Sequence, residues 1–105
     1  MTKVRIRRTN GTCILSAEGH AEREETETGN IVCAAVSILV QTLIQFCREH
    51  LDSTTDYRDQ VEDGYVFVKV ETDEKEIESA FAFTETGLSL IEDRYPDRVH
   101  VIKGE

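Results

Sequence analysis

The sequence predicts an α+β domain in which two helices pack on an antiparallel or mixed sheet, with the elements in the order ββαββαβ. Two pairs of segments with alternating apolar and polar residues support this class. The first pair is joined by Asn10-Gly11 and the second by Asp63-Gly64. Both dipeptides are strong signals for a β-hairpin between such segments. Each hairpin is followed by a longer segment with helical spacing of its apolar residues.

The first hairpin has one apolar side. With Asn and Gly in the turn, the register places Ile6 opposite Leu15 and Val4 opposite Ala17. This side is expected to face the core. Cys13 falls on the same side and is expected to be a small buried hydrophobic residue. The second strand then ends immediately before a Gly-His dipeptide.

The first helix is predicted from about Ile31 to Leu51. Asn30 is a suitable N-cap because its side-chain oxygen can accept a hydrogen bond from an unpaired backbone N–H. The helix is apolar nearly all round, which is typical of a helix buried on more than one side. Cys33 heads the narrow polar stripe that interrupts the apolar surface, so its thiol points where polar groups can reach it. The rest of the stripe consists of Ser37, Gln41, Gln45 and Arg48.

The second hairpin is predicted to bury three valines of its returning strand. Across the Asp-Gly turn the pairs are Val66 with Val61, Val68 with Asp59, and Val70 with Tyr57. Tyr65 and Phe67 then lie on the opposite face, where a partner subunit, a peptide or solvent covers them.

The second helix is predicted to begin after Thr72 or Asp73 as its cap and to run to Tyr95, where Pro96 ends it. Gly87 lies inside this helix at a cost of about 1 kcal/mol relative to Ala. We therefore expect it to mark a bend or the close approach of another backbone. Residues 99–102 are predicted to form a last short strand, with His100 exposed on it.

The overall composition favours one soluble domain over residues 1–105. The chain is 39% hydrophobic and 31% charged, which is ordinary for a globular protein. The formal net charge of −9 argues against nucleic acid as the main partner, because phosphate binding requires a basic surface. The same charge is compatible with a basic peptide as substrate or ligand. An acidic surface that serves only solubility is the simpler interpretation.

The three cysteines, an odd number without a secretory signal pattern, favour free thiols in a reducing compartment, so a cytoplasmic location is expected. The most apolar stretch, residues 31–40, is shorter than the roughly 20 residues of a membrane span, so no membrane association is expected. Cys47 and His50 are spaced as a metal pair, but two ligands make a poor site, and packing at the helix end is expected instead. No cofactor is predicted.

The stretch from Gly19 to Ser37 carries the candidate chemistry. With Asn30 as cap, Cys33 lies in the first helical turn, where the helix dipole and free N–H groups favour a thiolate. An imidazole from His20, at the end of the preceding strand, would complete a Cys–His pair for nucleophilic catalysis. Backbone N–H groups at the helix start, that of Cys33 among them, are candidate donors to an oxyanion.

These residues resemble a known family. Gly19-His20-Ala21, a loop of about a dozen residues, and then Ile-Val-Cys-Ala-Ala-Val-Ser at residues 31–37 look like the ribosomal-processing cysteine proteases of bacteria, the Prp family. Weaker similarity lies in Gly87-Leu88 and in residues 95–101. The family usually has Asp where this chain has Asn30. Its usually glycine-rich loop here contains Glu22, Arg23, Glu24, Glu25 and Glu27.

The resemblance implies that His20 and Cys33 form a catalytic dyad. It also implies a substrate, the N-terminal extension of a large-subunit ribosomal protein, and a homodimer, which the apolar first helix also favours. Asn30 either orients His20 or only caps the helix, and Ser37 either lines the substrate groove or only packs there. Two alternatives remain: a non-catalytic module that binds ribosomes or a protein partner, and a thiol redox or metal site. The second lacks a C-x-x-C motif and a ligand cluster.

Overall fold

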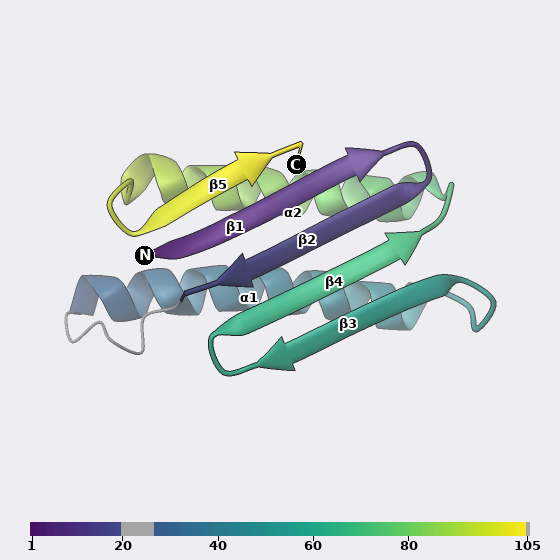
Figure 1. The fold of residues 1–105 in the computed structure, drawn as a ribbon, viewed down its shortest axis with the longest axis horizontal. Coiled ribbons are helices and arrows are strands. Elements are labelled where there is room, and N and C mark those ends of the chain that lie inside the picture. The colour runs from purple at the N-terminus through teal and green to yellow at the C-terminus, as the bar shows by residue number, and fades with distance from the viewer. Residues whose placement is uncertain (20–26, 105) are drawn as a thin grey trace.

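The chain forms a five-stranded sheet with two helices on one of its faces (Figure 1). The computed structural model describes residues 1–19 and 27–104. For residues 27–30 it describes the backbone only. The elements are β1 (Thr2–Thr9), β2 (Thr12–Glu18), α1 (Glu27–His50), β3 (Asp56–Glu62), β4 (Tyr65–Glu71), α2 (Lys75–Arg94) and β5 (Val99–Lys103). The predicted class and order of elements are therefore confirmed.

The strand order across the sheet is β3-β4-β2-β1-β5. The strands of each hairpin, β1 with β2 and β3 with β4, pair antiparallel. The two hairpins pair with each other through β2 and β4, also antiparallel. β5 joins the remaining edge of β1 in parallel, because α2 carries the chain back across the sheet before β5 begins. The sheet is therefore mixed, and β2 is its central strand.

The predicted hairpin registers are confirmed. Ile6 pairs with Leu15 in the first hairpin, and Val68 pairs with Asp59 in the second. The turn glycines, Gly11 and Gly64, have positive φ angles of 75° and 85°, the conformation that a two-residue hairpin turn requires. Turn chemistry and apolar alternation thus fix the same register, because a slip by one residue would move every core side chain to the solvent face.

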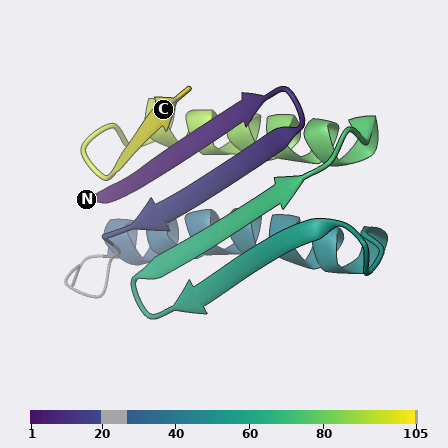
Figure 2. The ribbon, with the colours of Figure 1, turned by 45° about the vertical axis from the view of Figure 1, so that its right-hand side comes forward.

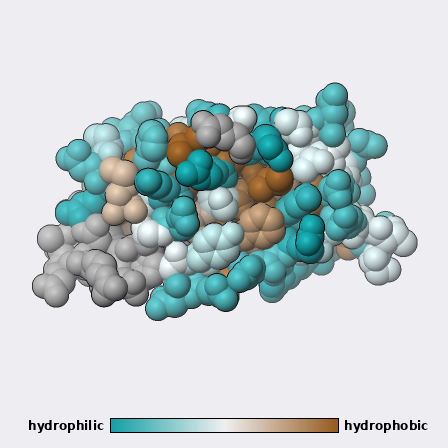
Figure 3. Space-filling view, in the orientation of Figure 1, coloured by the Kyte–Doolittle hydropathy of each residue, from teal (hydrophilic) through white to brown (hydrophobic). Residues whose placement is uncertain are grey.

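The helices cover one face of the sheet and leave the other open. In Figures 1 and 2, α1 and α2 both lie behind the strands. The core lies between the helices and the sheet and includes Cys13, as predicted. Tyr65 and Phe67 lie half-buried on the open face, opposite the buried valines of β4. Figure 3 shows apolar atoms at the centre of this face, surrounded by hydrophilic residues.

The predicted start of the first helix is wrong. α1 begins at Glu27, so Asn30 is its fourth residue and not its N-cap. Cys33 is the seventh residue and lies in the second turn. The prediction based on Asn30 failed because a good capping residue does not mark the start of a helix when the residues before it also adopt helical dihedral angles.

The second helix also departs from prediction at its start and at Gly87. Its N-cap is Glu74, whereas the hydroxyl of Thr72 accepts a hydrogen bond from the N–H of that cap residue at 3.2 Å. A Cβ at Gly87 would meet the methyl carbons of Leu39 at 3.0 and 3.1 Å. Gly87 therefore admits a side chain of α1, and not another backbone.

α1 is less enclosed than its composition predicts. Its inner face packs on the sheet through Val32, Val36 and Val40, but Ile31 and Ile38 are exposed. The segment Ile31–His50 is also long and apolar enough to cross a membrane, so the apolar stretch does not end at residue 40. Its buried side chains belong to the core, which is why a helix of a globular domain passes this test.

Candidate active site

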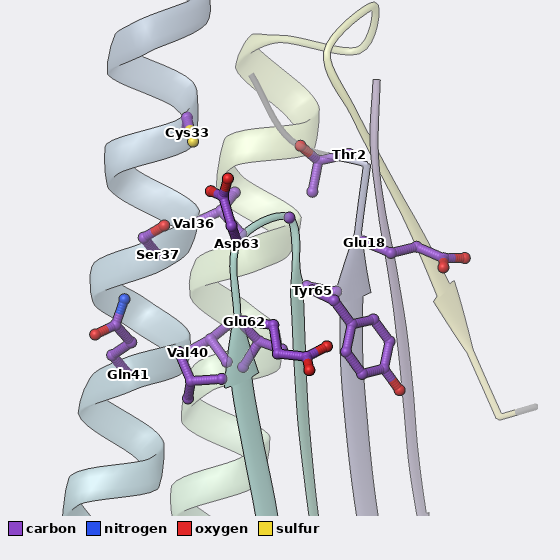
Figure 4. A pocket seen from close by; sticks show the side chains of 14 residues that line it. Thr2, Glu18, Cys33, Val36, Ser37, Val40, Gln41, Glu62, Asp63 and Tyr65 are labelled. Atoms are coloured by element: carbon purple, nitrogen blue, oxygen red, sulfur yellow. The ribbon is translucent and has the colours of Figure 1, made fainter. Parts of the chain in front are cut away.

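A cavity of about 220 Å³ opens between α1 and the tip of the β3–β4 hairpin (Figure 4). One wall is the polar stripe of α1, and Cys33, Ser37 and Gln41 line it at intervals of four residues. Residues at this spacing share one face of a helix. The prediction that Cys33 heads a polar stripe with Ser37 is therefore confirmed. Val36 and Val40 form an apolar floor beside the stripe.

The opposite wall is the hairpin tip, from Val61 to Val66. Its lining includes Glu62 and Asp63 of the tip, and Glu18 at the end of β2 lines the same cavity. The described lining therefore carries three carboxylates and no lysine or arginine. Sequence reasoning recognised the Asp63-Gly64 turn but not its place opposite Cys33. Nothing in local sequence signals a contact between segments 30 residues apart.

Gly19 ties the end of β2 to this wall. Its N–H donates a hydrogen bond to the carbonyl oxygen of Gly64 at 3.2 Å. Its φ is +73°, and a Cβ there would lie 2.8 Å from the carbonyl oxygen of Met1. Only glycine fits both constraints. The chain thus leaves the sheet at the cavity, directly before His20. His20 itself lies outside the residues that the structure describes.

The helix start lies further from the thiol than predicted. The unpaired N–H groups of an α-helix belong to its first turn, and α1 already includes Glu27, six residues before Cys33. The N–H of Cys33 lies inside the helical hydrogen-bonding pattern, so it is not available as a donor to an oxyanion. The dipole effect also falls off within the first turn. Activation of the thiol by the helix terminus, as predicted, is therefore not the arrangement in this structure.

Comparison with protein families identifies the chain. The model of the family described as cysteine protease Prp matches residues 1–100. The chain belongs to the Prp family. Comparison with curated proteins gives no match.

Solved structures share the fold over nearly the whole chain. The essential ribosomal processing protease Prp of Staphylococcus aureus, in complex with a covalently linked product peptide, is 19% identical, with a TM-score of 0.80 over 98% of this chain and 99% of that one. The same protease in complex with a substrate peptide gives 17% identity and a TM-score of 0.78 over the same shares. SMU.848 from Streptococcus mutans is 22% identical, with a TM-score of 0.75 over 99% and 94%. At these identities the likeness concerns the fold.

The two other thiols of this Prp family member are enclosed in the core. Cys13 and Cys47 are buried and, like Cys33, not in a disulfide. Burial raises the pKa of the Cys47 thiol to about 11, with smaller contributions from Cys13 and Asp59. Burial also raises the pKa of Cys13, and Glu78 adds to the effect. Both thiols are therefore protonated at neutral pH and inaccessible to a substrate.

The described residues provide no metal centre: in 1–19 and 27–104, no three His, Cys, Asp or Glu side chains gather as a group that could hold an ion. His50, considered above with Cys47, instead stacks on Phe46 with ring centroids 4.0 Å apart. Its Nδ1 lies 2.9 Å from the carbonyl oxygen of Phe46. The predicted packing at the helix end is confirmed. The chemistry of the cavity is thus that of a thiol, a hydroxyl, an amide and carboxylates.

Proposed function

We propose that this chain is a cysteine endopeptidase that removes the N-terminal extension of a large-subunit ribosomal protein, with Cys33 as nucleophile and His20 as its base. The observation that carries the proposal is the position of Cys33. It is the one cysteine of the three that is not buried, and it lines the cavity. Gly19, the residue before His20, is hydrogen-bonded to the opposite wall. Membership of the Prp family supplies the reaction class.

The mechanism is acyl transfer. His20 accepts the proton of the Cys33 thiol, and the thiolate attacks the carbonyl carbon of the scissile peptide bond. The tetrahedral intermediate collapses as the imidazolium returns the proton to the leaving amine, which leaves a thioester on Cys33. Water, activated by the imidazole, hydrolyses the thioester and releases the extension as a carboxylic acid. No cofactor takes part in this sequence.

The shape and charge of the cavity support a peptide substrate with basic residues. Val36, Val40 and Val66 provide an apolar floor for a side chain beside the scissile bond. The carboxylates at the mouth attract lysine and arginine, which are abundant in ribosomal proteins that contact RNA. The S. aureus protease of the same fold is described in complex with a substrate peptide.

Three further residues have supporting roles in the proposal. Ser37, one turn after the nucleophile on the cavity wall, is a hydrogen-bond donor to the substrate backbone. Gly19 allows the sharp departure of the chain towards His20. Asn30, no longer needed as a cap, is retained as a residue that orients His20.

The outer surface of the helices supports a homodimer. Ile31 and Ile38 are exposed on α1, and Phe83 and Leu90 are exposed on α2, in each case seven residues apart. Residues at this spacing share one face of a helix, so each helix presents an apolar stripe to solvent. Exposed apolar surface of this kind marks a site of association. We propose that a second copy of the chain binds this apolar surface. The proposed location of the protein is the cytoplasm.

Light scattering tests the dimer. The wild-type chain is expected to show twice the 11.9 kDa of one chain at micromolar concentration. Ile38→Glu with Phe83→Glu is expected to give the monomer, while Val61→Glu, at another exposed apolar residue, leaves the dimer intact. A monomeric wild-type protein would refute the proposal.

The substrate is tested by incubation with a ribosomal protein that carries an N-terminal extension, followed by mass spectrometry. Cleavage at one bond, with release of the extension as a free acid, is the expected result. A complex that forms and leaves the extension intact would instead identify a binding module of the same fold. Such a module would also react with iodoacetamide at Cys33 no faster than an ordinary accessible thiol does.

A further inference from the structure

A row of basic side chains crosses the open face of the sheet, opposite the helices. Arg58 of β3 is paired with Lys69 of β4, and Lys69 is paired with Ile14 of β2. Ile14 is in turn paired with Arg7 of β1. Side chains alternate between the two faces along a strand, and Val68, the neighbour of Lys69, is buried under the helices. The row therefore lies on the face that the helices leave open.

The adjacent row adds an aromatic ring and a further positive charge. Phe67 is half-buried and lies between Gln60 of β3 and Ser16 of β2. Ser16 is paired with Arg5 of β1. Figure 3 shows apolar atoms at the centre of this face, with hydrophilic residues around them. We call these two rows together the basic strip.

The basic strip differs in charge from the rest of the molecule. It holds four of the chain's 12 lysine and arginine residues and none of its 21 aspartate and glutamate residues. The carboxylates of the open face lie in the flanking rows, with Asp56 and Glu71 on one side and Glu62 and Glu18 on the other. The formal net charge of −9 is a sum over the whole chain and does not describe this strip.

The positive charges of the strip are placed together at a cost in stability. Arg58 and Lys69 are directly opposite each other, and like charges in this position repel. Within residues 1–19 and 27–104, the side chains of Arg58, Lys69 and Arg7 form no ion pair. The Nε of Arg7 is also buried without a hydrogen-bond partner. No described carboxylate thus neutralises these three cations, and an anionic ligand can do so.

The combination of cations with an exposed ring fits a single-stranded nucleic acid. Lysine and arginine bind phosphates, and an aromatic side chain on an open sheet stacks on unpaired bases. The amide of Gln60 and the hydroxyl of Ser16, on either side of Phe67, can donate and accept hydrogen bonds at a base edge. An acidic peptide would be attracted to the cations but would make no use of the ring.

The length of the strip agrees with a short nucleotide segment. The basic row crosses four strands, which are about 4.8 Å apart, so it spans about 14 Å. Open sheets of similar width hold about two or three stacked bases. Carboxylates in the flanking rows repel phosphates, so the favoured path runs across the strands and not along them.

We propose that the basic strip binds single-stranded RNA, with phosphates on Arg58, Lys69 and Arg7 and a base stacked on Phe67. The choice of RNA over DNA rests on the proposed function, because the proposed substrate belongs to a ribosomal protein. The charge pattern and the ring do not depend on that function. The strip shares no residue with the described lining of the Cys33 cavity, so RNA and peptide occupy different sites.

Fluorescence anisotropy with a fluorescein-labelled single-stranded RNA of about 12 nucleotides tests the proposal, at about 50 mM salt. The wild-type chain is expected to bind with a Kd on the order of 1–100 μM. Lys69→Gln should raise this Kd about 5-fold and lower the slope of log K against log salt by about 0.7, the share of one phosphate contact. The matched control is Lys75→Gln, which removes the same charge from an exposed position on α2 and should change little.

Phe67→Leu tests the stacking separately from the charge. It keeps an apolar side chain and removes the ring, so the Kd should rise by about 5–100-fold with an unchanged salt slope. Thermal melting shows whether each variant is folded at the assay temperature. Lys69→Gln is expected to raise the melting temperature by about 1–4 °C, because the repulsion between Lys69 and Arg58 is removed. Weaker binding in that variant then does not come from unfolding.

The outcomes decide the proposal without a protease assay. No binding by the wild type, or equal effects of Lys69→Gln and Lys75→Gln, would overturn it. Tighter binding of DNA of the same sequence would also overturn it, and tighter binding of a polyglutamate peptide would point to an acidic protein partner instead. A chain that binds RNA through the strip but leaves the ribosomal peptide intact would refute the proposed function alone.

Discussion

The two ends of α1 carry the same functional group in opposite surroundings. Near the N-terminal end, Cys33 is half-buried and lines the cavity. Almost four turns later, Cys47 has no exposed surface and lies in the core. Both thiols belong to one apolar helix, so neither composition nor helix propensity distinguishes them. The difference arises from what the β3–β4 hairpin places opposite each one.

The C-terminal end of α1 is closed by a side-chain network from β3. Arg48 donates two hydrogen bonds to the carboxylate of Asp59, at 2.9 and 2.7 Å, and the hydroxyl of Tyr57 donates a third at 2.7 Å. The paired geometry of a guanidinium and a carboxylate fixes the separation of helix and strand. At the other end, the hairpin tip places Asp63 on the side of the polar stripe of α1, and the cavity stays open (Figure 4). One end thus holds the helix in place, and the other leaves a thiol accessible.

The largest expected effect is that replacement by alanine has opposite consequences at the two cysteines, loss of activity at one and loss of stability at the other. Cys33→Ala should abolish cleavage and leave the melting temperature close to that of the wild type, because the side chain lines a cavity. Cys47→Ala should retain the cleavage rate and lose about 1–2 kcal/mol of stability, because it removes packed atoms from the core. Peptide cleavage and thermal denaturation of both variants provide the measurement. Loss of cleavage in Cys47→Ala at a temperature where it is folded would erase the distinction.

Thiol reactivity should differ by about 100-fold or more at pH 7. The thiolate is the reactive species, and a buried thiol with a pKa of about 11 has almost none of it at this pH. Iodoacetamide is expected to label Cys33 first in the native protein, and Cys13 and Cys47 only after denaturation. Peptide mapping after timed quenching gives the three rates. Uniform labelling of the native protein would show that both ends of the helix are equally open.

Asp59→Asn should produce the smallest of these effects. It weakens the contacts with Arg48 and Tyr57 at the closed end, and a drop of about 4–8 °C in melting temperature is expected, the change that roughly 1 kcal/mol gives in a domain of this size. The control is Asp56→Asn, an exposed residue of the same strand, which should have little effect.

The stability contributed by Asp59 should depend on pH. Hydrogen bonds from Arg48 are the main cause of the lowered pKa of the Asp59 carboxyl. A carboxyl with a lowered folded-state pKa contributes stability above its unfolded value of about 3.9, and this stability is lost as the pH falls through the folded value. The difference in melting temperature between wild type and Asp59→Asn should therefore shrink below about pH 4. A constant difference down to pH 2 would show that the ion pair does not hold the closed end.

The strands and their register were predictable because each rests on local chemistry. Asn10-Gly11 fixes the turn, and the alternation around it has only one register that keeps Ile6 and Leu15 together on an apolar side. The helix start was not predictable in the same way. Asn30 has the chemistry of a cap, but the helix extends three residues further towards the N-terminus, to Glu27. Helix boundaries depend on small free-energy differences that a single residue type does not decide.

The polar stripe of α1 was read from sequence because helical spacing alone places Cys33, Ser37 and Gln41 on one face. The residues that this face meets across the cavity could not be predicted from the sequence. The strand order β3-β4-β2-β1-β5 brings the tip of the second hairpin to the end of β2, so Asp63 lies opposite Cys33 and Gly19 is bonded to Gly64. These contacts link segments far apart in the chain, and they depend on the order in which strands pair.

The sequence by itself thus determined the elements, their register and the identity of the thiol that heads a polar stripe, because periodicity and turn chemistry act over a few residues. Only the tertiary structure decided that this thiol faces a carboxylate across a cavity while its counterpart on the same helix is enclosed. The physical reason is that strand order positions the hairpin against α1, and no property of the helix alone encodes what lies opposite each of its turns.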